Sequence, residues 1–512
     1  MSIQPARPSP CMSAAQAEPM VNVRKQVYAG ALVLADATQA AAQRDLLVED
    51  GLITAVEAPG TFDRIEDARR IDLAGRLLIP GLVNGHTHAH GGLGRGAVPD
   101  RLPLEGFIAS IGALNGQRGL DHIRLSAELT AVELLHRGCT ATYDMAAEFP
   151  APSVAGLLAV AEAYHALGMR AVVAPMLADR TLWQAYPGLL GALPHALADR
   201  MRALRAAPPD ASLDAVRRAA AIWPFDRERV RLGLAPTIPM HCSDEFLLAC
   251  SAASQEFGLP LQTHLAESRA QAAIARQRYG RSLVAHLAHV GLLGEHVSAA
   301  HAIWVGDDDI QRLADAGATA VHNPLSNMRL GSGIAPVRRM LERGLAVGLG
   351  TDGANTSDTQ NLFEAMRAAA YLSRLLDGPA PARWLDAGEA FHAATAGSAR
   401  VLGWADRIGR IAPGLQADLV ALRLDGMHFV PLRDALRQLV YGENGAGVER
   451  VWVGGRLLLE HGRVLTIDED RLRRDAQAAA SHLDGLNAEA LATAAQVQPW
   501  VTAFCCGLGG PA

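Results

Sequence analysis

Lysine is almost absent from this sequence, because Lys25 is the only lysine among 47 basic residues. Cysteine is also scarce, and the six cysteines form no Cys-x-x-Cys pair and no regular framework. That pattern is typical of reduced thiols in a cytoplasmic protein. Apolar runs are interrupted by charge well short of the roughly 18 residues that cross a bilayer, so we predict no membrane-spanning segment.

A basic surface is lacking as well. The 53 acidic residues outnumber the 47 basic ones and give a formal net charge of −6. No positive field attracts phosphates, which argues against binding of nucleic acid or of an anionic membrane. With 512 residues, 50% of them hydrophobic, the chain can bury a large core in one large domain plus a smaller one. A small molecule is the expected binding partner.

Short β-type runs alternate with longer Ala/Leu-rich segments of helical spacing from Cys139 to Gly353. Together with the run that precedes this region, eight strands are expected. They are Leu77–Asn84, Cys139–Met145, Arg170–Leu177, Val230–Thr237, Pro260–Ala266, Val297–Val305, Thr319–Asn323 and Ala346–Thr351. Eight is the number that closes an α/β protein into a (β/α)8 barrel of the TIM type.

The segments on either side of this barrel have a different pattern. Val27–Val56 and Gly409–Thr466 contain short β-type runs punctuated by Gly and Asp, which predicts that they pair into one small β-sandwich domain. We therefore expect a loose leader at 1–20, the first part of the sandwich at 21–78, the barrel at 79–404, the second part of the sandwich at 405–468 and a helical tail at 469–512. The tail is expected to be helical to about Gln498.

The first chemical motif is the sequence PGLVNGHTHAH, in which an apolar strand ends in His86 and His88. Residues i and i+2 of a strand point the same way, so two imidazoles at the end of a first barrel strand can hold one ion. Two exposed turn histidines are the alternative, and they would be favoured for an isolated pair. The glycine-rich segment Gly91–Gly96 that follows is interpreted as a flexible loop over the site.

The second motif is THLAES, also at the end of an expected strand. His264 offers a third ligand, and Glu267 stands where the next helix begins, close enough to exchange a proton with a metal-bound water. The alternative for Glu267 is an ordinary acidic residue at a helix N-terminus, favoured by the helix dipole.

His301 and Asp352 end the sixth and eighth expected strands. A core histidine and a helix-capping aspartate are the ordinary interpretations of these two residues. The four sites taken together outweigh these ordinary interpretations, because each places a ligand-type residue at the carboxyl end of an expected barrel strand. That face is where barrel enzymes carry their chemistry.

The motifs PGLVNGHTH, THLAES, AAHAIWV, VHNPLSNMRLGSGIAPV and GLGTDGANTSD occur here in one order. With them, the chain resembles the amidohydrolase superfamily over roughly residues 20 to 470. The resemblance is to the branch that holds cytosine deaminase, guanine deaminase, methylthioadenosine/S-adenosylhomocysteine deaminase and the chlorotriazine hydrolases. The motifs are specific for the superfamily and much less so for the substrate.

This resemblance implies a role for each matching residue. The metal ligands would be His86, His88, His264 and Asp352, with Glu267 as the proton shuttle. His301 matches a histidine that hydrogen-bonds the hydroxide or the substrate. The HNPLSN motif matches an element that lines the pocket, so His322 and Asn323 are expected to contact the substrate.

The scarcity of lysine limits the metal count that this resemblance allows. Dinuclear relatives commonly bridge two ions with a carboxylated lysine on the fourth strand, and the sole lysine here, Lys25, precedes the barrel. We therefore predict one divalent ion, zinc for a His₃Asp ligand set, with iron or manganese as alternatives. Metal-bound hydroxide, oriented by Asp352 and His301, is expected to attack a ring carbon while Glu267 moves protons, releasing ammonia.

The substrate is less well specified than the reaction. Glu105 lies near where thioadenosine deaminases hold a ribose, and Trp183 stands in an unusual aromatic loop, so both are predicted to bind substrate. However, Thr237 replaces a histidine of that group and its Trp-Pro-x-Glu stretch is missing, which counts against a nucleoside. A small purine, pterin, pyrimidine or triazine is expected. Hydrolysis of an amide, a urea or a halide is the alternative reaction, and a non-catalytic assembly protein is a remote one. A homodimer is possible by analogy.

Overall fold

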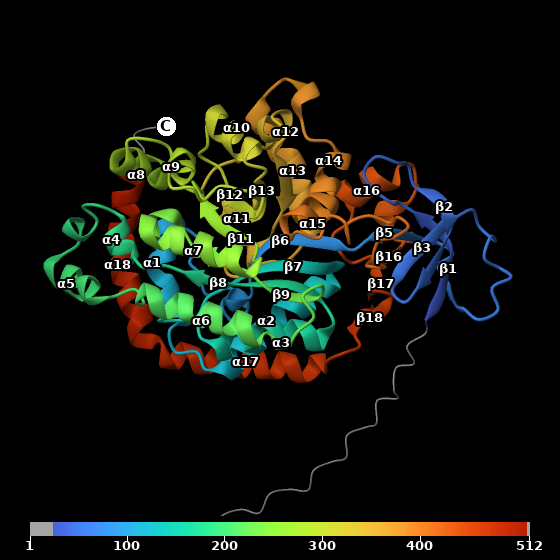
Figure 1. Ribbon diagram of the computed structural model, residues 1–512, viewed down its shortest axis with the longest axis horizontal. Helices are drawn as coiled ribbons and strands as arrows, with labels where there is room; N and C mark the ends of the chain where they lie inside the picture. Colours follow the sequence, from blue (N-terminus) through green and yellow to red (C-terminus); the bar gives the residue numbers. More distant parts are fainter. Residues whose placement is uncertain (1–23, 509–512) are drawn as a thin grey trace, which may run out of the picture.

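The structure is a computed structural model that describes residues 24–508. The predicted leader at 1–20 therefore lies outside the described residues. Figure 1 shows a barrel of strands surrounded by helices and, beside it, a sheet built from segments that precede and follow the barrel. None of the helices between residues 24 and 508 combines the length and the apolar character needed to cross a bilayer.

Parallel strands form the barrel and follow one another around it in chain order. They are β6 (Leu82–His88), β7 (Cys139–Ala146), β8 (Arg170–Leu177), β9 (Val230–Leu232), β10 (Ala235–Pro236), β11 (Leu261–Leu265), β12 (Val297–His301), β13 (Thr319–His322), β14 (Ala346–Leu349) and β15 (Asp352–Gly353). Leu234 bridges to Leu261, and β15 pairs with β6, so the ring closes. The predicted (β/α)8 barrel is confirmed.

Helices cover the outside of the barrel. They are α1 (Leu104–Asn115), α2 (Leu120–His136), α3 (Val154–Leu167), α4 (Leu182–Ala185), α5 (His195–Ala203), α6 (Pro209–Ile222), α7 (Asp244–Phe257), α8 (Arg269–Tyr279), α9 (Leu283–His289), α10 (Asp307–Asp315), α11 (Pro324–Arg329), α12 (Val337–Glu342), α13 (Leu362–Asp377), α14 (Ala387–His392) and α15 (Ser398–Val401). Several begin at a serine that caps the first turn, as Ser153 and Ser268 do, and end at a left-handed glycine, as Gly168 and Gly280 do.

The flanking segments pair into one nine-stranded sheet. Its strands are β1 (Lys25–Val33), β2 (Ala42–Glu49), β3 (Leu52–Glu57), β4 (Arg69–Asp72), β5 (Arg76–Pro80), β16 (Leu419–Arg423), β17 (Val448–Val453), β18 (Arg456–Glu460) and β19 (Arg463–Val464), with α16 (Ala435–Gly442) between β16 and β17. Tyr28 on β1 and Trp452 on β17 have ring centroids 5.2 Å apart although β5 and β16 separate their strands. The sheet therefore curls over a shared core, as a sandwich does.

A buried ion pair joins the sheet to the bottom of the barrel. Arg170, at the start of β8, donates from Nε and Nη2 to the two carboxylate oxygens of Asp418, at 2.8 and 3.1 Å. Asp418 also accepts the backbone N–H of Gly454 at 2.7 Å. This contact lies at the amino end of the strands, so the carboxyl end stays free for chemistry.

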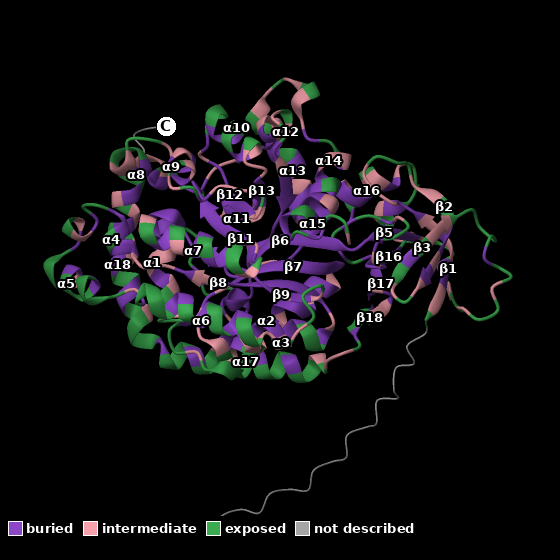
Figure 2. Ribbon diagram, viewed as in Figure 1, coloured by how far each residue is buried: buried purple, intermediate pink, exposed green. Residues whose placement is uncertain are grey.

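The chain after the sheet forms two helices, α17 (Glu469–Leu486) and α18 (Ala488–Gly507). Figure 1 shows α17 running along the helical layer and α18 turning up beside α1. The expected end of the helix near Gln498 is wrong, because α18 continues through Pro499. Val497, Val501 and Cys505 are buried, and this packing outweighs the backbone hydrogen bond that proline cannot make. Figure 2 shows buried strands and an exposed outer face on α17.

Candidate metal centre and pocket

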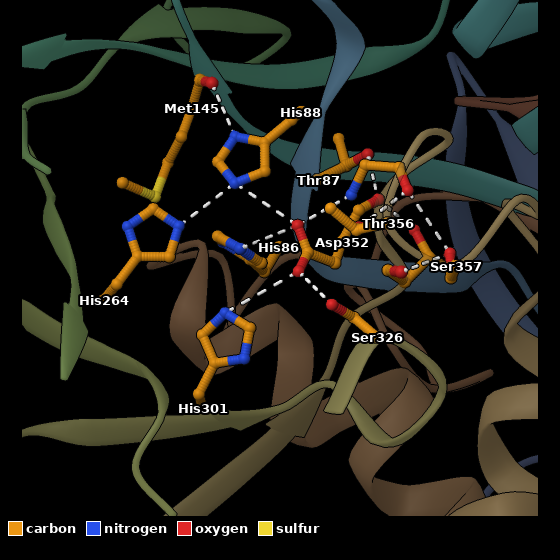
Figure 3. Close-up of polar contacts among 12 residues, drawn as sticks. His86, Thr87, His88, Met145, His264, His301, Ser326, Asp352, Thr356 and Ser357 are labelled. Carbon is orange, nitrogen blue, oxygen red and sulfur yellow. Dashed lines mark hydrogen bonds and ion pairs between the residues drawn. The ribbon is translucent and has the colours of Figure 1, made fainter. Parts of the chain in front are cut away.

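Four barrel strands bring their terminal side chains together at the carboxyl end of the barrel. His86 and His88 end β6, His264 lies on β11, His301 ends β12 and Asp352 begins β15. All five are buried. Figure 3 shows the four imidazole rings arranged around the Asp352 carboxylate. Two overlapping groups of potential ligand atoms result, one of His86, His88 and His264 and one of His86, His301 and Asp352.

Hydrogen bonds to the far nitrogen of each ring fix which nitrogen faces the centre. His88 Nδ1 donates to the Met145 carbonyl at 2.9 Å, and His264 Nδ1 donates to the Thr237 carbonyl at 2.6 Å. His86 Nδ1 donates to Gln262 Oε1 at 2.7 Å. A neutral imidazole that donates from Nδ1 presents an unprotonated Nε2. Three lone pairs therefore point into the centre.

These lone pairs repel one another unless a cation lies between them. His88 Nε2 and His264 Nε2 lie 3.1 Å apart, and neither carries a proton when both rings donate from Nδ1. Burial, with the nearby His86, lowers the pKa of His88 to about 4, so protonation does not relieve the contact near neutral pH. His86 Nε2 is buried without any hydrogen-bond partner. The donor set fits a divalent ion that takes nitrogen ligands.

Asp352 supplies the negative charge of this centre. Its Oδ1 lies 3.3 Å from His88 Nε2 and 3.6 Å from His86 Nε2, and its Oδ2 accepts the Ser326 hydroxyl at 2.6 Å. Burial alone would raise the pKa of Asp352, but the close approach of His86 and of the other surrounding imidazoles holds it well below its usual value. The carboxylate is therefore ionised and ready to bind a cation.

Glu267 and His301 lie beside the group formed by His86, His88 and His264 and do not belong to it. His301 donates from Nδ1 to Asn327 Oδ1 at 2.8 Å, and its Nε2 is buried without a partner, 3.8 Å from Asp352 Oδ2. Glu267 Oε1 lies 3.6 Å from His301 Nδ1. Burial, with the charges of Asp352 and Glu105, raises the pKa of Glu267 well above its usual value. Burial therefore favours the protonated form of Glu267.

A pocket of about 700 Å3 opens over this centre. His88, His264, Glu267 and Asp352 form part of its lining, and Trp183 lines it from the loop after β8. This volume falls within the roughly 300–1,000 Å3 of pockets that hold drug-sized ligands. The arrangement combines ligands for an ion, a protonatable carboxyl and an enclosed space for a small molecule.

Three residues predicted to contact substrate do not line this pocket. Glu105 is buried and accepts hydrogen bonds from the hydroxyls of Ser268 and Tyr186, the latter at 3.3 Å. His322 lines a separate cavity with Leu349 and His392. Asn323 packs under the centre, where its Oδ1 would be 2.3 Å from a Cβ added at Gly350.

Two functional candidates belong to no motif of the sequence. Gln262 precedes His264 by two residues on β11, so strand alternation places both inside the barrel, and this periodicity could have found it. His241 lines the pocket from the turn after β10, and its Nε2 is buried without a partner. The sequence offers His241 only as one of several loop residues that could contact substrate.

Comparison with known proteins identifies relatives of nearly full length. A sequence model described as the amidohydrolase family matches residues 77–458. A 5-methylthioadenosine/S-adenosylhomocysteine deaminase of Desulforudis audaxviator is 36% identical over 446 residues, which cover 86% of this chain and 94% of the relative. A 5'-deoxyadenosine deaminase of Methanosarcina mazei is 32% identical over 440 residues, covering 86% and 93%.

Solved structures agree with these relatives. An adenosine deaminase from Xanthomonas campestris with bound zinc has a TM-score of 0.79 at 26% identity, covering 90% of this chain and 98% of the other. Atrazine chlorohydrolase from Arthrobacter aurescens, complexed with zinc, has a TM-score of 0.78 at 28% identity, covering 89% and 99%. The same architecture thus carries both amine and chloride leaving groups among the neighbours.

Proposed function

The chain belongs to the amidohydrolase family, and we propose that it removes the exocyclic amine of a purine-type heterocycle with one zinc ion held by His86, His88, His264 and Asp352. The expected reaction class, metal-dependent hydrolysis of a carbon–nitrogen bond, is confirmed by the family and by its deaminase relatives. The observation that carries the proposal is that three Nε2 atoms, each on a ring whose Nδ1 faces a hydrogen-bond acceptor, meet the Asp352 carboxylate where the pocket opens.

A divalent ion bound by these four residues would supply Lewis-acid activation of a water molecule. The remaining chemistry belongs to the chain. Glu267, protonated because burial raises its pKa, donates to a ring nitrogen and makes the adjacent carbon electron-poor. It then takes one proton from the water and passes it to the departing amine, and it recovers the hydroxyl proton of the adduct as the ring carbonyl forms. Water and the aminoheterocycle thus become ammonia and a ring carbonyl, and Glu267 is again protonated. His301 accepts a hydrogen bond at its free Nε2 and orients the water.

Recognition of the heterocycle is assigned to the pocket wall. Burial lowers the pKa of His241 to about 4, so its ring is neutral and its partnerless Nε2 can make one hydrogen bond to a ring atom. Trp183 lines the same pocket and is proposed to stack on the ring. For Glu105 we propose an indirect role, because its contact with Ser268 places it behind the segment that holds Glu267.

The test is ammonia release by the zinc-reconstituted protein across aminopurines, pterins, pyrimidines and triazines. We expect turnover of aminopurines above that of the other classes, since the relatives are named for adenosine-type substrates. Dehalogenation is the second candidate, favoured by the atrazine chlorohydrolase neighbour. Chloride release from a chlorotriazine without ammonia release from any amine would replace the first proposal by the second.

A further inference from the structure

The outer part of the pocket is built by a helix outside the family-matched segment. The match ends at residue 458, whereas α18 spans Ala488–Gly507. Ala490, Thr493, Ala494 and Val497, on one face of α18, line the same pocket as His264 and Asp352. The tail therefore reaches the active-site cavity.

Hydrogen bonds hold α18 in this position. Gln498 Nε2 donates to Ser110 Oγ on α1 at 2.5 Å, and Arg200 Nη2 on α5 donates to Thr493 Oγ1 at 2.8 Å. Close packing supports these bonds, because a Cβ added at Gly106 of α1 would lie 3.1 Å from Thr502 Oγ1. The helix is thus a fixed wall between α1 and α5.

Apolar side chains make up much of the lining beside α18. Ile108 and Ile111 of α1 line the same pocket, as do Met201 on α5 and Leu204 just after it. We call the space bounded by these four residues and by Ala490, Ala494 and Val497 the outer chamber.

Charged groups near the outer chamber already have protein partners. The Glu148 carboxylate accepts the Ser153 backbone N–H at 2.7 Å and the Ser153 hydroxyl at 2.8 Å. Arg205 Nη1 donates to the Leu204 carbonyl at 2.9 Å. Glu105, the remaining acid in this region, is engaged by Ser268 and Tyr186 and does not line the pocket. No unengaged carboxylate among these is available to accept hydrogen bonds from the diol of a sugar.

We propose that α18 is a specificity element and that the outer chamber binds an apolar substituent carried by the heterocyclic substrate. The inference rests on the proposed function for the position of the heterocycle at the metal end. The pocket volume of about 700 Å3 leaves room for such a group, and its burial favours binding in proportion to the area removed from water.

The experiment measures kcat/KM for adenine derivatives that carry a methyl, propyl or hexyl group on the imidazole nitrogen. A carboxyalkyl derivative of hexyl length is the charged comparison, since Arg180, Arg200 and Arg205 also line the pocket. Wild-type kcat/KM is expected to rise by about fourfold for each added methylene. A flat series, or preference for the carboxyalkyl derivative, would overturn the apolar assignment.

Two variants fill the outer chamber from different helices. Ala494→Leu acts from α18, and Gly112→Leu acts from α1, where an added Cβ meets no atom within 4 Å and folding is not endangered. Both should abolish the gain from methyl to hexyl, so that the ratio of the two kcat/KM values falls to about one. Ala495→Leu, on the exposed face of α18, is the matched control and should behave as wild type.

Failure of this inference differs from failure of the proposed function. The methyl derivative could be deaminated while both filling variants keep the chain-length dependence of the wild type. That result would refute the role of α18 and leave the proposed function intact. If no derivative is deaminated, calorimetric binding of the hexyl derivative still decides the matter. Binding that both filling variants weaken and Ala495→Leu does not would support the chamber, and equal binding by all variants would refute it.

Discussion

The proposed reaction depends on the Glu267 side chain for proton transfer, whereas metal binding does not require it. It stands outside both groups of potential ligand atoms, yet it lines the pocket beside His264. We expect Glu267→Gln to lower turnover by roughly 10²–10⁴-fold, because an amide cannot exchange the proton. Zinc content should stay at the wild-type level. Glu148→Gln, an acid of the same pocket bound to Ser153, is the control. Retained turnover in Glu267→Gln would remove this residue from the mechanism.

We expect Gln262 to influence metal binding through His86. Its Oε1 accepts from His86 Nδ1, while its Nε2 donates to the Gly85 carbonyl and to Ser298 Oγ, both at 3.0 Å. Gln262→Leu removes the acceptor that fixes the His86 tautomer, so zinc affinity should fall by about 10–100-fold. Competition with a chromogenic chelator measures this change. Ser298→Ala keeps the bond to His86 and should bind zinc as wild type does; an equal loss in both variants would show a merely structural role.

At this scale the sequence predicted residues that belong to motifs and missed those that do not. His86, His88, His264 and Asp352 do lie together, although their roles as ligands stay a prediction. His241 and the residues of α18 have no motif, and only the path of the chain brings them to the pocket. For Glu105 the sequence predicts a substrate contact, which stays a prediction, and the hydroxyls that engage its carboxylate come from segments distant in the sequence.

The strands show where one-dimensional patterns succeed and fail. Arg170–Leu177 was predicted at its observed bounds. Leu77–Asn84, predicted as one strand, is two, because β5 pairs with β16 of the sheet and β6 pairs with β7 of the barrel. The change occurs at Gly81, where a Cβ would lie 2.1 Å from Thr140 Oγ1. An apolar run does not reveal which sheet each half joins.

The segment after β6 also differs from its prediction. Instead of a flexible loop, residues Ala89–Gly94 form the buried helix η1. A Cβ at Gly92 would lie 2.9 Å from both the Ser126 carbonyl and Thr130 Oγ1, whereas at Gly94 the nearest atom is at 3.5 Å.

These two glycines give a matched test of the packing of η1. Gly92→Ala should lower the free energy of unfolding by about 1–3 kcal/mol through overpacking. Gly94→Ala should change it little, because its added methyl group makes ordinary contacts. Chemical denaturation of both variants measures the difference, and equal stabilities would contradict the close approach of η1 to α2.

The whole molecule should hold one metal ion for each chain. Lys25, the only lysine, lies on β1 of the sheet and pairs with Glu49 and Asp67, so no lysine is available to bridge a second ion. Metal analysis of the fully active protein should return one equivalent. Two equivalents at full activity would overturn this expectation.

Removal of the ion should lower the midpoint of thermal unfolding, because the ion binds the folded state, and added zinc should restore it. A cytoplasmic location and a homodimer stay predictions.

The curled sheet sets the order in which this protein can be completed during synthesis. Strands β1 to β5 leave the ribosome before the whole barrel, and β16 to β19 leave after it. Until β16 arrives, the nascent chain carries β5 with an unpaired hydrogen-bonding edge, which is the kind of surface that seeds misassembly. The Arg170 side chain also lacks its ion-pair partner until Asp418 has been synthesised. The early strands therefore depend on protection by the growing barrel or by chaperones until the last quarter of the polypeptide is translated.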